Sequence, residues 1–71
     1  MKFYQIYNVA HNGWLKSYDY GSFDKVVWGR VEEGIRYAQA KSAIMVVGAL
    51  IPFNDIDEGD CKIVEFTGRM K

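Results

Sequence analysis

The dipeptide Asn12-Gly13 constrains the fold of this chain more than any other local feature. It lies between two segments that are rich in β-forming residues, 3–9 and 14–20. Asn and Gly accept the positive φ angles that a two-residue type I′ turn requires at both of its positions. We therefore predict an antiparallel hairpin that turns at these two residues.

A second turn is predicted at Gly21-Ser22, which fits a type II′ turn because glycine stands first. It separates the segment 14–20 from a third β-rich segment, 23–28. Three strands joined by two tight turns form an antiparallel meander.

Residues 30–51 have a different character, since Ala, Glu, Gln, Lys and Met replace most of the aromatic residues. Two interpretations remain: a single helix across the whole span, or a short helix at 31–37, a break near Ala38 and a main helix at 39–50. Gly34 would destabilise a continuous helix by about 1 kcal/mol relative to alanine. We therefore predict the broken version.

After the helix, Pro52 gives a clear stop, because proline disfavours helical geometry in the residue before it. An acidic, turn-rich loop follows at 54–60, and 61–67 alternates between apolar and polar residues as a fourth strand does. The order β-β-β-α-β predicts an α+β fold, a two-layer sandwich of one sheet and one helix layer. The 71 residues are expected to form a single domain, 1–71.

The predicted register divides the side chains of the meander between two faces of the sheet. It pairs His11 with Trp14, Tyr7 with Tyr18, and Tyr20 with Phe23. The more aromatic face collects Phe3, Tyr7, Val9, Trp14, Tyr18, Tyr20, Phe23 and Val27, with Gln5, His11, Lys16 and Lys25 between them. The opposite face collects Tyr4, Ile6, Ala10, Leu15, Val26 and Trp28, with Asn8, Ser17, Asp19 and Asp24.

Neither face is mostly polar, although a sheet face exposed to water should be. One helix layer covers only one face, and we expect the more aromatic face to be the core side. Whichever face remains, several large apolar side chains stay uncovered, and such patches usually mark a binding site.

The helical segment gives a second indication of a partner. Between Ala43 and Ile51, only Gly48 is not plainly apolar. A helix without a polar side is expected to be buried on more than one side. A second chain is therefore predicted to cover it, through self-association or through a protein partner.

Tyrosine and tryptophan supply much of the binding energy at protein interfaces. The candidate partner-binding residues are Tyr7, Trp14, Lys16, Tyr18 and Tyr20, or, if the faces are reversed, Tyr4, Leu15 and Trp28. The predicted function is that of a small non-enzymatic interaction protein. The alternative is a single-stranded nucleic-acid-binding protein, because bases stack on aromatic sheets and Lys16 and Lys25 lie among these rings.

The charge balance favours the protein partner. Nine Lys and Arg residues match nine Asp and Glu residues, so the formal net charge is zero. Binding to nucleic acids or membrane surfaces usually requires a positive excess. The longest apolar run is too short for a bilayer, which a helix crosses with about 20 residues. The lone cysteine suits a reducing compartment, and we expect a cytoplasmic protein without a membrane partner.

Few residues suit catalysis or metal binding. His11 and Cys61 are the only candidates for a base and a nucleophile, and nothing in their spacing brings them together. The run Asp55-x-Asp57-x-Gly59 resembles the start of a calcium loop, but the glycine stands fifth instead of sixth and no glutamate stands twelfth. We expect no enzyme activity, no metal and no cofactor.

Several short stretches together resemble small accessory proteins of tailed bacteriophages. These stretches are Asn12-Gly13-Trp14-Leu15, Val26-Val27-Trp28, Glu32-Glu33-Gly34-Ile35-Arg36-Tyr37-Ala38 and Lys62-Ile63-Val64-Glu65-Phe66. The resemblance covers most of the chain, and its motifs are structural. It implies a protein made in an infected bacterium that modulates or inhibits a host or phage protein by binding it. It names no functional residue.

Overall fold

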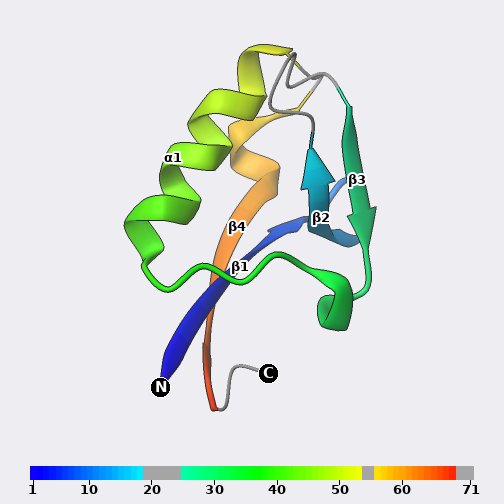
Figure 1. Ribbon diagram of the computed structural model, residues 1–71. Coiled ribbons are helices and arrows are strands. Elements are labelled where there is room, and N and C mark those ends of the chain that lie inside the picture. The colour runs from blue at the N-terminus through cyan, green and yellow to red at the C-terminus, as the bar shows by residue number, and fades with distance from the viewer. Residues whose placement is uncertain (19–24, 54–55, 69–71) are drawn as a thin grey trace.

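The computed structural model describes residues 1–18, 25–53 and 56–68. The described elements are the strands β1 (Lys2–Asn8), β2 (Gly13–Tyr18), β3 (Val26–Gly29) and β4 (Cys61–Thr67), the helix α1 (Ala40–Leu50), and the single 3₁₀ turns η1 (Val31–Glu33), η2 (Ile51–Phe53) and η3 (Glu58–Asp60). The strands form one antiparallel sheet in the order β3-β2-β1-β4, with α1 on one side of it (Figure 1). The predicted α+β fold with the order β-β-β-α-β is confirmed.

The fourth strand has the predicted bounds. It pairs with β1 along its whole length, from Lys2 opposite Thr67 to Asn8 opposite Cys61. β4 therefore forms one edge of the sheet, and β3 forms the other.

The predicted turn of the first hairpin is wrong. Tyr7 lies opposite Trp14 and Asn8 lies opposite Gly13, so residues 9–12 form a four-residue connection and Gly13 belongs to β2. The predicted opposition of Tyr7 and Tyr18 does not occur. The register differs from the prediction by four residues, an even number, so each side chain of β1 stays on its predicted face.

Asn8 explains the longer turn. Its side-chain Oδ1 accepts a hydrogen bond from the backbone N–H of His11 (2.9 Å), which closes an Asx-type turn over residues 9 and 10. Asn12 then takes the one positive φ (49°) found at a described non-glycine residue. A side-chain acceptor at the end of β1 thus competes successfully with the two-residue turn.

A β-bulge changes the faces in the second hairpin, whose predicted turn at Gly21-Ser22 lies outside the described residues. Leu15 pairs with Trp28, and then the register shifts so that Tyr18 pairs with Val26. Lys16 is the extra residue of β2. Because of this one-residue shift, Tyr18 packs on the same side as Leu15 instead of the predicted aromatic face.

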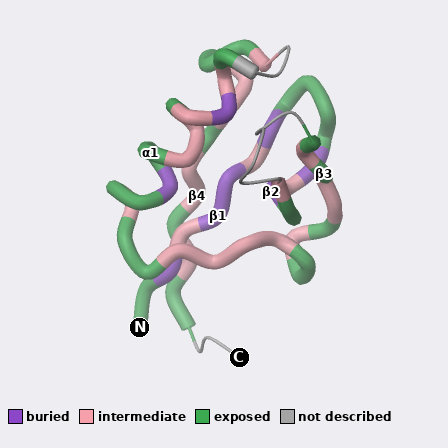
Figure 2. Tube along the Cα trace, turned by 45° about the horizontal axis from the view of Figure 1, so that its top comes forward, coloured by how far each residue is buried: buried purple, intermediate pink, exposed green. Residues whose placement is uncertain are grey.

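The helix covers the face opposite to the one expected. The core cluster consists of Ile6, Leu15, Ala43 and Leu50, each at most 2% exposed. Figure 2 shows buried stretches on β1, on β2 and on the side of α1 that faces the sheet. The expectation that the more aromatic face forms the core is wrong, because the compact aliphatic side chains of Ile6 and Leu15 let Ala43 approach the sheet closely, which bulky rings would prevent.

The break before the helix is confirmed, but the short helix predicted at 31–37 contains only η1. The chain then becomes extended and fills the gap where β1 and β2 separate. The Ile35 N–H donates to the Leu15 carbonyl (2.9 Å), and Tyr37 exchanges two backbone hydrogen bonds with Tyr4 (both 2.8 Å). The main helix ends at Leu50, and Pro52 follows within η2.

Candidate partner-binding surface

Four aromatic rings meet on the outer face, which is the side of the sheet that faces away from α1. The members of this aromatic cluster are Phe3, Tyr7, Trp14 and Phe66. Phe3 and Phe66 stack with centroids 5.2 Å apart, Phe66 and Trp14 lie 5.6 Å apart, and Trp14 and Tyr7 lie 4.9 Å apart. Contacts of this kind contribute about 0.5–1.5 kcal/mol each beyond area burial, so the rings fix one another in position.

The strand register creates this cluster. Phe3 lies opposite Phe66 in the pairing of β1 with β4, and Tyr7 lies opposite Trp14 in the pairing of β1 with β2. Side chains opposite one another in antiparallel strands are about 5 Å apart and interact directly. Two cross-strand pairs therefore build a surface that extends over three strands.

Residues 31–36 cover one part of the outer face. Gln5 is 2% exposed, and its Nε2 donates to the Val31 carbonyl (2.8 Å). The Arg36 guanidinium lies 5.4 Å from the centre of the Phe3 ring, a distance at which the cation and the ring attract each other. Phe3 is consequently 9% exposed, whereas Tyr7, Trp14 and Phe66 are only half-buried.

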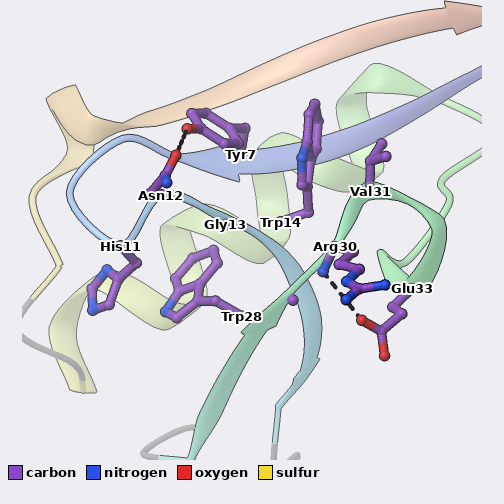
Figure 3. A pocket seen from close by; sticks show the side chains of 10 residues that line it. Tyr7, His11, Asn12, Gly13, Trp14, Trp28, Arg30, Val31 and Glu33 are labelled. Atoms are coloured by element: carbon purple, nitrogen blue, oxygen red, sulfur yellow. Dashed lines mark hydrogen bonds between the residues drawn. The ribbon is translucent and has the colours of Figure 1, made fainter.

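A pocket of about 560 Å³ opens beside the half-buried rings. Figure 3 shows Tyr7 and Asn12 on one side of it, Arg30 and Glu33 on the other, and Trp14 between them. The full lining consists of Tyr7, His11, Asn12, Gly13, Trp14, Trp28, Gly29, Arg30, Val31 and Glu33. Gly29 is the register partner of Trp14, and a Cβ added there would lie 3.2 Å from both Glu33 Oε1 and Lys16 Cδ, so glycine leaves room for this ion pair at the rim.

Hydrogen bonds and an ion pair hold the rim of the pocket. The Tyr7 hydroxyl donates to Asn12 Oδ1 (2.6 Å). Lys16 Nζ lies 2.9 Å from Glu33 Oε2, and the Arg30 backbone N–H donates to Glu33 Oε1 (3.2 Å). The lysine first, and then the Arg30 N–H, lower the pKa of the Glu33 carboxyl. These contacts connect the two sides of the rim to the strands and to η1.

Several charged side chains of the described residues lie around the outer face. Lys16, Arg30 and Arg36 border the cluster or the pocket, and Lys62 lies opposite Tyr7 in β4. Glu33 is the carboxylate in the pocket lining. The acidic residues of η3 belong to a different region, beside the start of β4.

Of the predicted partner-binding residues, the structure brings four to one pocket: Tyr7, Trp14 and, from the alternative set, Trp28 line it, and Lys16 pairs with Glu33 at its rim. Tyr7 and Trp14 are in ring contact, and exposed Lys16 lies at the pocket rim. Tyr18 packs against the core because of the bulge, and Tyr20 lies outside the described residues.

The alternative set lies on the helix side of the sheet. Leu15 is only 1% exposed and therefore offers no contact surface. Trp28 packs against the core and stacks on the His11 ring, with centroids 5.2 Å apart. The Tyr4 hydroxyl donates to Glu65 Oε1 (3.1 Å), and this hydrogen bond raises the tyrosine pKa.

Phe66, Arg30 and Arg36 were missing from the sequence-based site. The alternation in 61–67 identified Phe66 as a strand residue, but its pairing with Phe3 depends on where β4 joins the sheet. Arg30 directly precedes η1, and Arg36 lies in the extended segment after it, where the sequence pattern predicted a helix over 31–37.

His11 and Cys61 come closer than their spacing suggested, because both contact Asn8. The amide Oδ1 lies 2.9 Å from His11 Nδ1, and the amide Nδ2 lies 3.4 Å from the Cys61 sulfur. Burial raises the pKa of the Cys61 thiol, and the neighbouring carboxylates add to this effect against the opposing hydrogen bond from Asn8. An activated nucleophile needs a lowered pKa, so this arrangement does not favour thiol catalysis.

Within residues 1–18, 25–53 and 56–68, no group of three or more His, Cys, Asp or Glu side chains is arranged to hold a metal ion. Asp57 instead caps η3 by accepting a hydrogen bond from the Gly59 N–H (2.9 Å), and Asp55 lies outside the described residues. In the described part of the chain, every helix is too short or too polar to cross a membrane.

Comparison with known proteins adds no relative. No protein-family model matches the sequence, and searches of curated proteins and of solved structures find no significant match. The residues of the outer face therefore carry the functional interpretation by themselves.

Proposed function

We propose that this protein is a small, non-enzymatic interaction protein that binds a partner protein through its outer face. One observation carries the proposal: the half-buried rings of Tyr7, Trp14 and Phe66 lie side by side, uncovered by α1, next to a pocket of about 560 Å³. At protein interfaces, a few aromatic residues beside a pocket typically supply most of the binding energy.

The packing of the rings favours a protein over a nucleic acid. Bases bind by stacking on free ring faces. Here Phe3 and Phe66 stack on each other, and Arg36 lies over Phe3. Lys16 is engaged by Glu33. Because of these contacts, fewer ring faces and fewer cations are available to bind a single strand.

Single-stranded nucleic-acid binding is the second candidate, and exposed cations beside the aromatic rings favour it. Arg30 and Lys62 are exposed beside Tyr7 and Trp14. A nucleic-acid complex would weaken steeply as the salt concentration rises, because binding releases counterions from the phosphates. Salt dependence therefore distinguishes the two candidates.

The resemblance to accessory proteins of tailed bacteriophages supports a partner from an infected bacterium. Under this proposal the chain acts in the host cytoplasm and modulates or inhibits a host or phage protein by occupying its surface. No cofactor is required for such a function.

The test is capture from bacterial lysate on the tagged chain, with and without nuclease and at low and high salt. A discrete protein retained after nuclease and at high salt supports the proposal, and nuclease-sensitive retention supports the second candidate. Trp14→Ala is expected to weaken binding by about 30-fold, which corresponds to about 2 kcal/mol. Arg30→Glu, at an exposed rim position, tests the same surface without removing a packed ring. Unchanged binding in both folded variants would contradict the proposal.

A further inference from the structure

The side of α1 that faces away from the sheet core exposes apolar residues. Ile44 is 59% exposed and Met45 is 66% exposed. A Cβ added at Gly48 would meet no atom within 4 Å, so this side of the helix is open. Exposed aliphatic side chains in adjacent positions are the kind of surface that associates in water.

A groove of about 240 Å³ continues this apolar surface to the edge of the sheet. Ile44, Val47, Gly48 and Ile51 line it from the helix side, and Cys61 and Ile63 of β4 line it from the strand side. Because β4 is an edge strand, one side of its backbone has no neighbouring strand among the described residues. An open strand edge beside an apolar groove can accept a further strand.

The charges at the two ends of the groove have opposite sign. Glu58 lies in the lining at the end where β4 begins, and Asp57 and Asp60 adjoin it in the sequence. Exposed Lys41 lies in the first turn of α1, at the other end, because α1 and β4 run in opposite directions (Figure 1). Lys2 and Glu65 at that end form an ion pair with each other (4.0 Å).

We propose that a second copy of this chain covers the groove, with β4 pairing antiparallel to β4 of the partner about a two-fold axis near Val64. An antiparallel arrangement reverses the second copy, so that the Lys41 end of each chain meets the acidic η3 end of the other. The same favourable contact then occurs twice, as a two-fold interface requires. Charge complementarity of this kind selects a second copy over an unrelated apolar peptide.

The geometry of the fold accommodates this dimer. Val64 is the middle residue of β4 (Cys61–Thr67), so a pairing centred there uses the whole strand. Paired strands are about 4.8 Å apart and packed helices about 8–10 Å apart. Two α1 helices on the same side of one continuous sheet therefore meet across the axis, where Ile44 and Met45 of each chain contact the partner.

The first experiment is the mass of the native chain by light scattering, over about 1–100 µM protein, a range that detects micromolar affinity. We expect a species of twice the 8.2 kDa of one chain. Ile44→Glu is expected to give the monomer. Val27→Glu, at a 47% exposed apolar position on the opposite edge strand β3, is the matched control and should remain dimeric. A monomer at every concentration, or dissociation by the control alone, would overturn the proposal.

A charge exchange tests the antiparallel orientation. Lys41→Glu and Glu58→Lys are each expected to weaken the dimer by about tenfold, since each places like charges at two contacts. The double variant restores the opposite charges and should recover most of the affinity. If the double variant instead loses as much affinity as the two single variants together, the predicted contact between these ends is contradicted.

A cross-link tests the axis. In a Cys61→Ser background, Val64→Cys places two thiols opposite each other at the axis, where a short bis-maleimide should join the chains. Val27→Cys in the same background should not cross-link. Equal cross-linking of both variants, or none at position 64 in a dimeric sample, would exclude β4 pairing. These readouts need no external partner, so they fail or succeed independently of the outer-face function.

Discussion

Asn12 shows how one residue supports both the turn and the pocket. Its backbone has a φ of 49°, and its side chain accepts the Tyr7 hydroxyl hydrogen bond. Asn12→Ala is expected to destabilise the protein by about 1–2 kcal/mol more than Asn12→Gly, because alanine disfavours the left-handed conformation that glycine accepts freely. Urea unfolding of both variants measures this difference. Equal stabilities would mean that the turn relaxes to a negative φ.

Gly34 is required by the side chain it covers. A Cβ at this position would overlap Nε2 of Gln5, which is buried and hydrogen-bonded to the Val31 carbonyl. Gly34→Ala should therefore displace Gln5 and lower the free energy of unfolding by about 1–3 kcal/mol, the cost of losing a buried hydrogen bond. Gly48→Ala is the matched control, because the space around it is open and alanine favours the helix by about 1 kcal/mol. Chemical denaturation should change in opposite directions for the two variants.

The Cys61 thiol makes the stability of the fold depend on pH. Burial raises its pKa, with a further contribution from nearby carboxylates, of which Asp60 is the largest. The folded chain thus holds the thiol proton at pH values where the unfolded chain has lost it. The resulting stability is present below the pKa of the unfolded thiol and is lost as the pH rises through the higher folded value.

This predicts slow alkylation of Cys61 at neutral pH. The rate plotted against pH should show its inflection at a higher pH for the folded chain than for the same chain in urea. Measurement at a low protein concentration keeps the groove free of a second copy. An inflection at or below that of the unfolded chain would show that the thiol is activated, and it would reopen a chemical role for Cys61.

At the scale of elements, the bulge in β2 determines which face each side chain joins. Lys16 has two separable roles: its ammonium pairs with Glu33, and its backbone supplies the extra residue between Leu15 and Ser17. Lys16→Ala should have a small effect on stability, because exposed ion pairs contribute about 0–1 kcal/mol. Deletion of Lys16 removes the bulge but leaves the pairs Leu15–Trp28, Ser17–Val27 and Tyr18–Val26 in register, so Tyr18 should stay on the core side and the deletion variant should unfold at about the same urea concentration as Lys16→Ala. A deletion variant that is much less stable than Lys16→Ala would show that the protein needs the bulge itself.

Patterns confined to one segment predicted the elements well. The alternation of 61–67 gave β4 its bounds, and Gly34 together with Pro52 predicted the break and the end of the helix. The first turn was mispredicted because the Asn8 side chain closes a longer turn than the local dipeptide favours. The alternation of apolar and polar residues in β2 gives no signal for the bulge at Lys16.

Which face of the sheet α1 covers, and which side chains meet on each face, could be predicted only from the arrangement of the whole sheet. Both faces carry apolar residues, so composition did not decide which one α1 covers. The close approach of Ala43 to Ile6 and Leu15 decides it. Tyr7 and Trp14 were predicted correctly to share one face, because a register error of four residues leaves the faces unchanged, but their direct pairing was not predicted. The position of Phe66 depended on the pairing of β4 with β1.

At the scale of the whole molecule, the two proposed surfaces lie on opposite layers. Trp14 belongs to the outer face of the sheet, and Ile44 belongs to the exposed side of α1. A two-fold axis perpendicular to the sheet would leave both outer faces of the dimer on the same side. The dimer would therefore bind two partner molecules on one surface, and the second contact would be effectively intramolecular.

This arrangement predicts that one mutation can remove the dimer without changing how each chain contacts the partner, and that another mutation can weaken this contact without removing the dimer. On a densely immobilised partner, Ile44→Glu should dissociate about 10²-fold faster than the native chain, because it binds with one site instead of two. On a sparse surface the two proteins should dissociate at equal rates. Trp14→Ala should bind weakly in both formats and keep the mass of a dimer. If Ile44→Glu weakens binding equally on dense and sparse surfaces, then the helix side contacts the partner directly. This result would contradict the assignment of partner binding to the outer face and of dimer formation to the helix side.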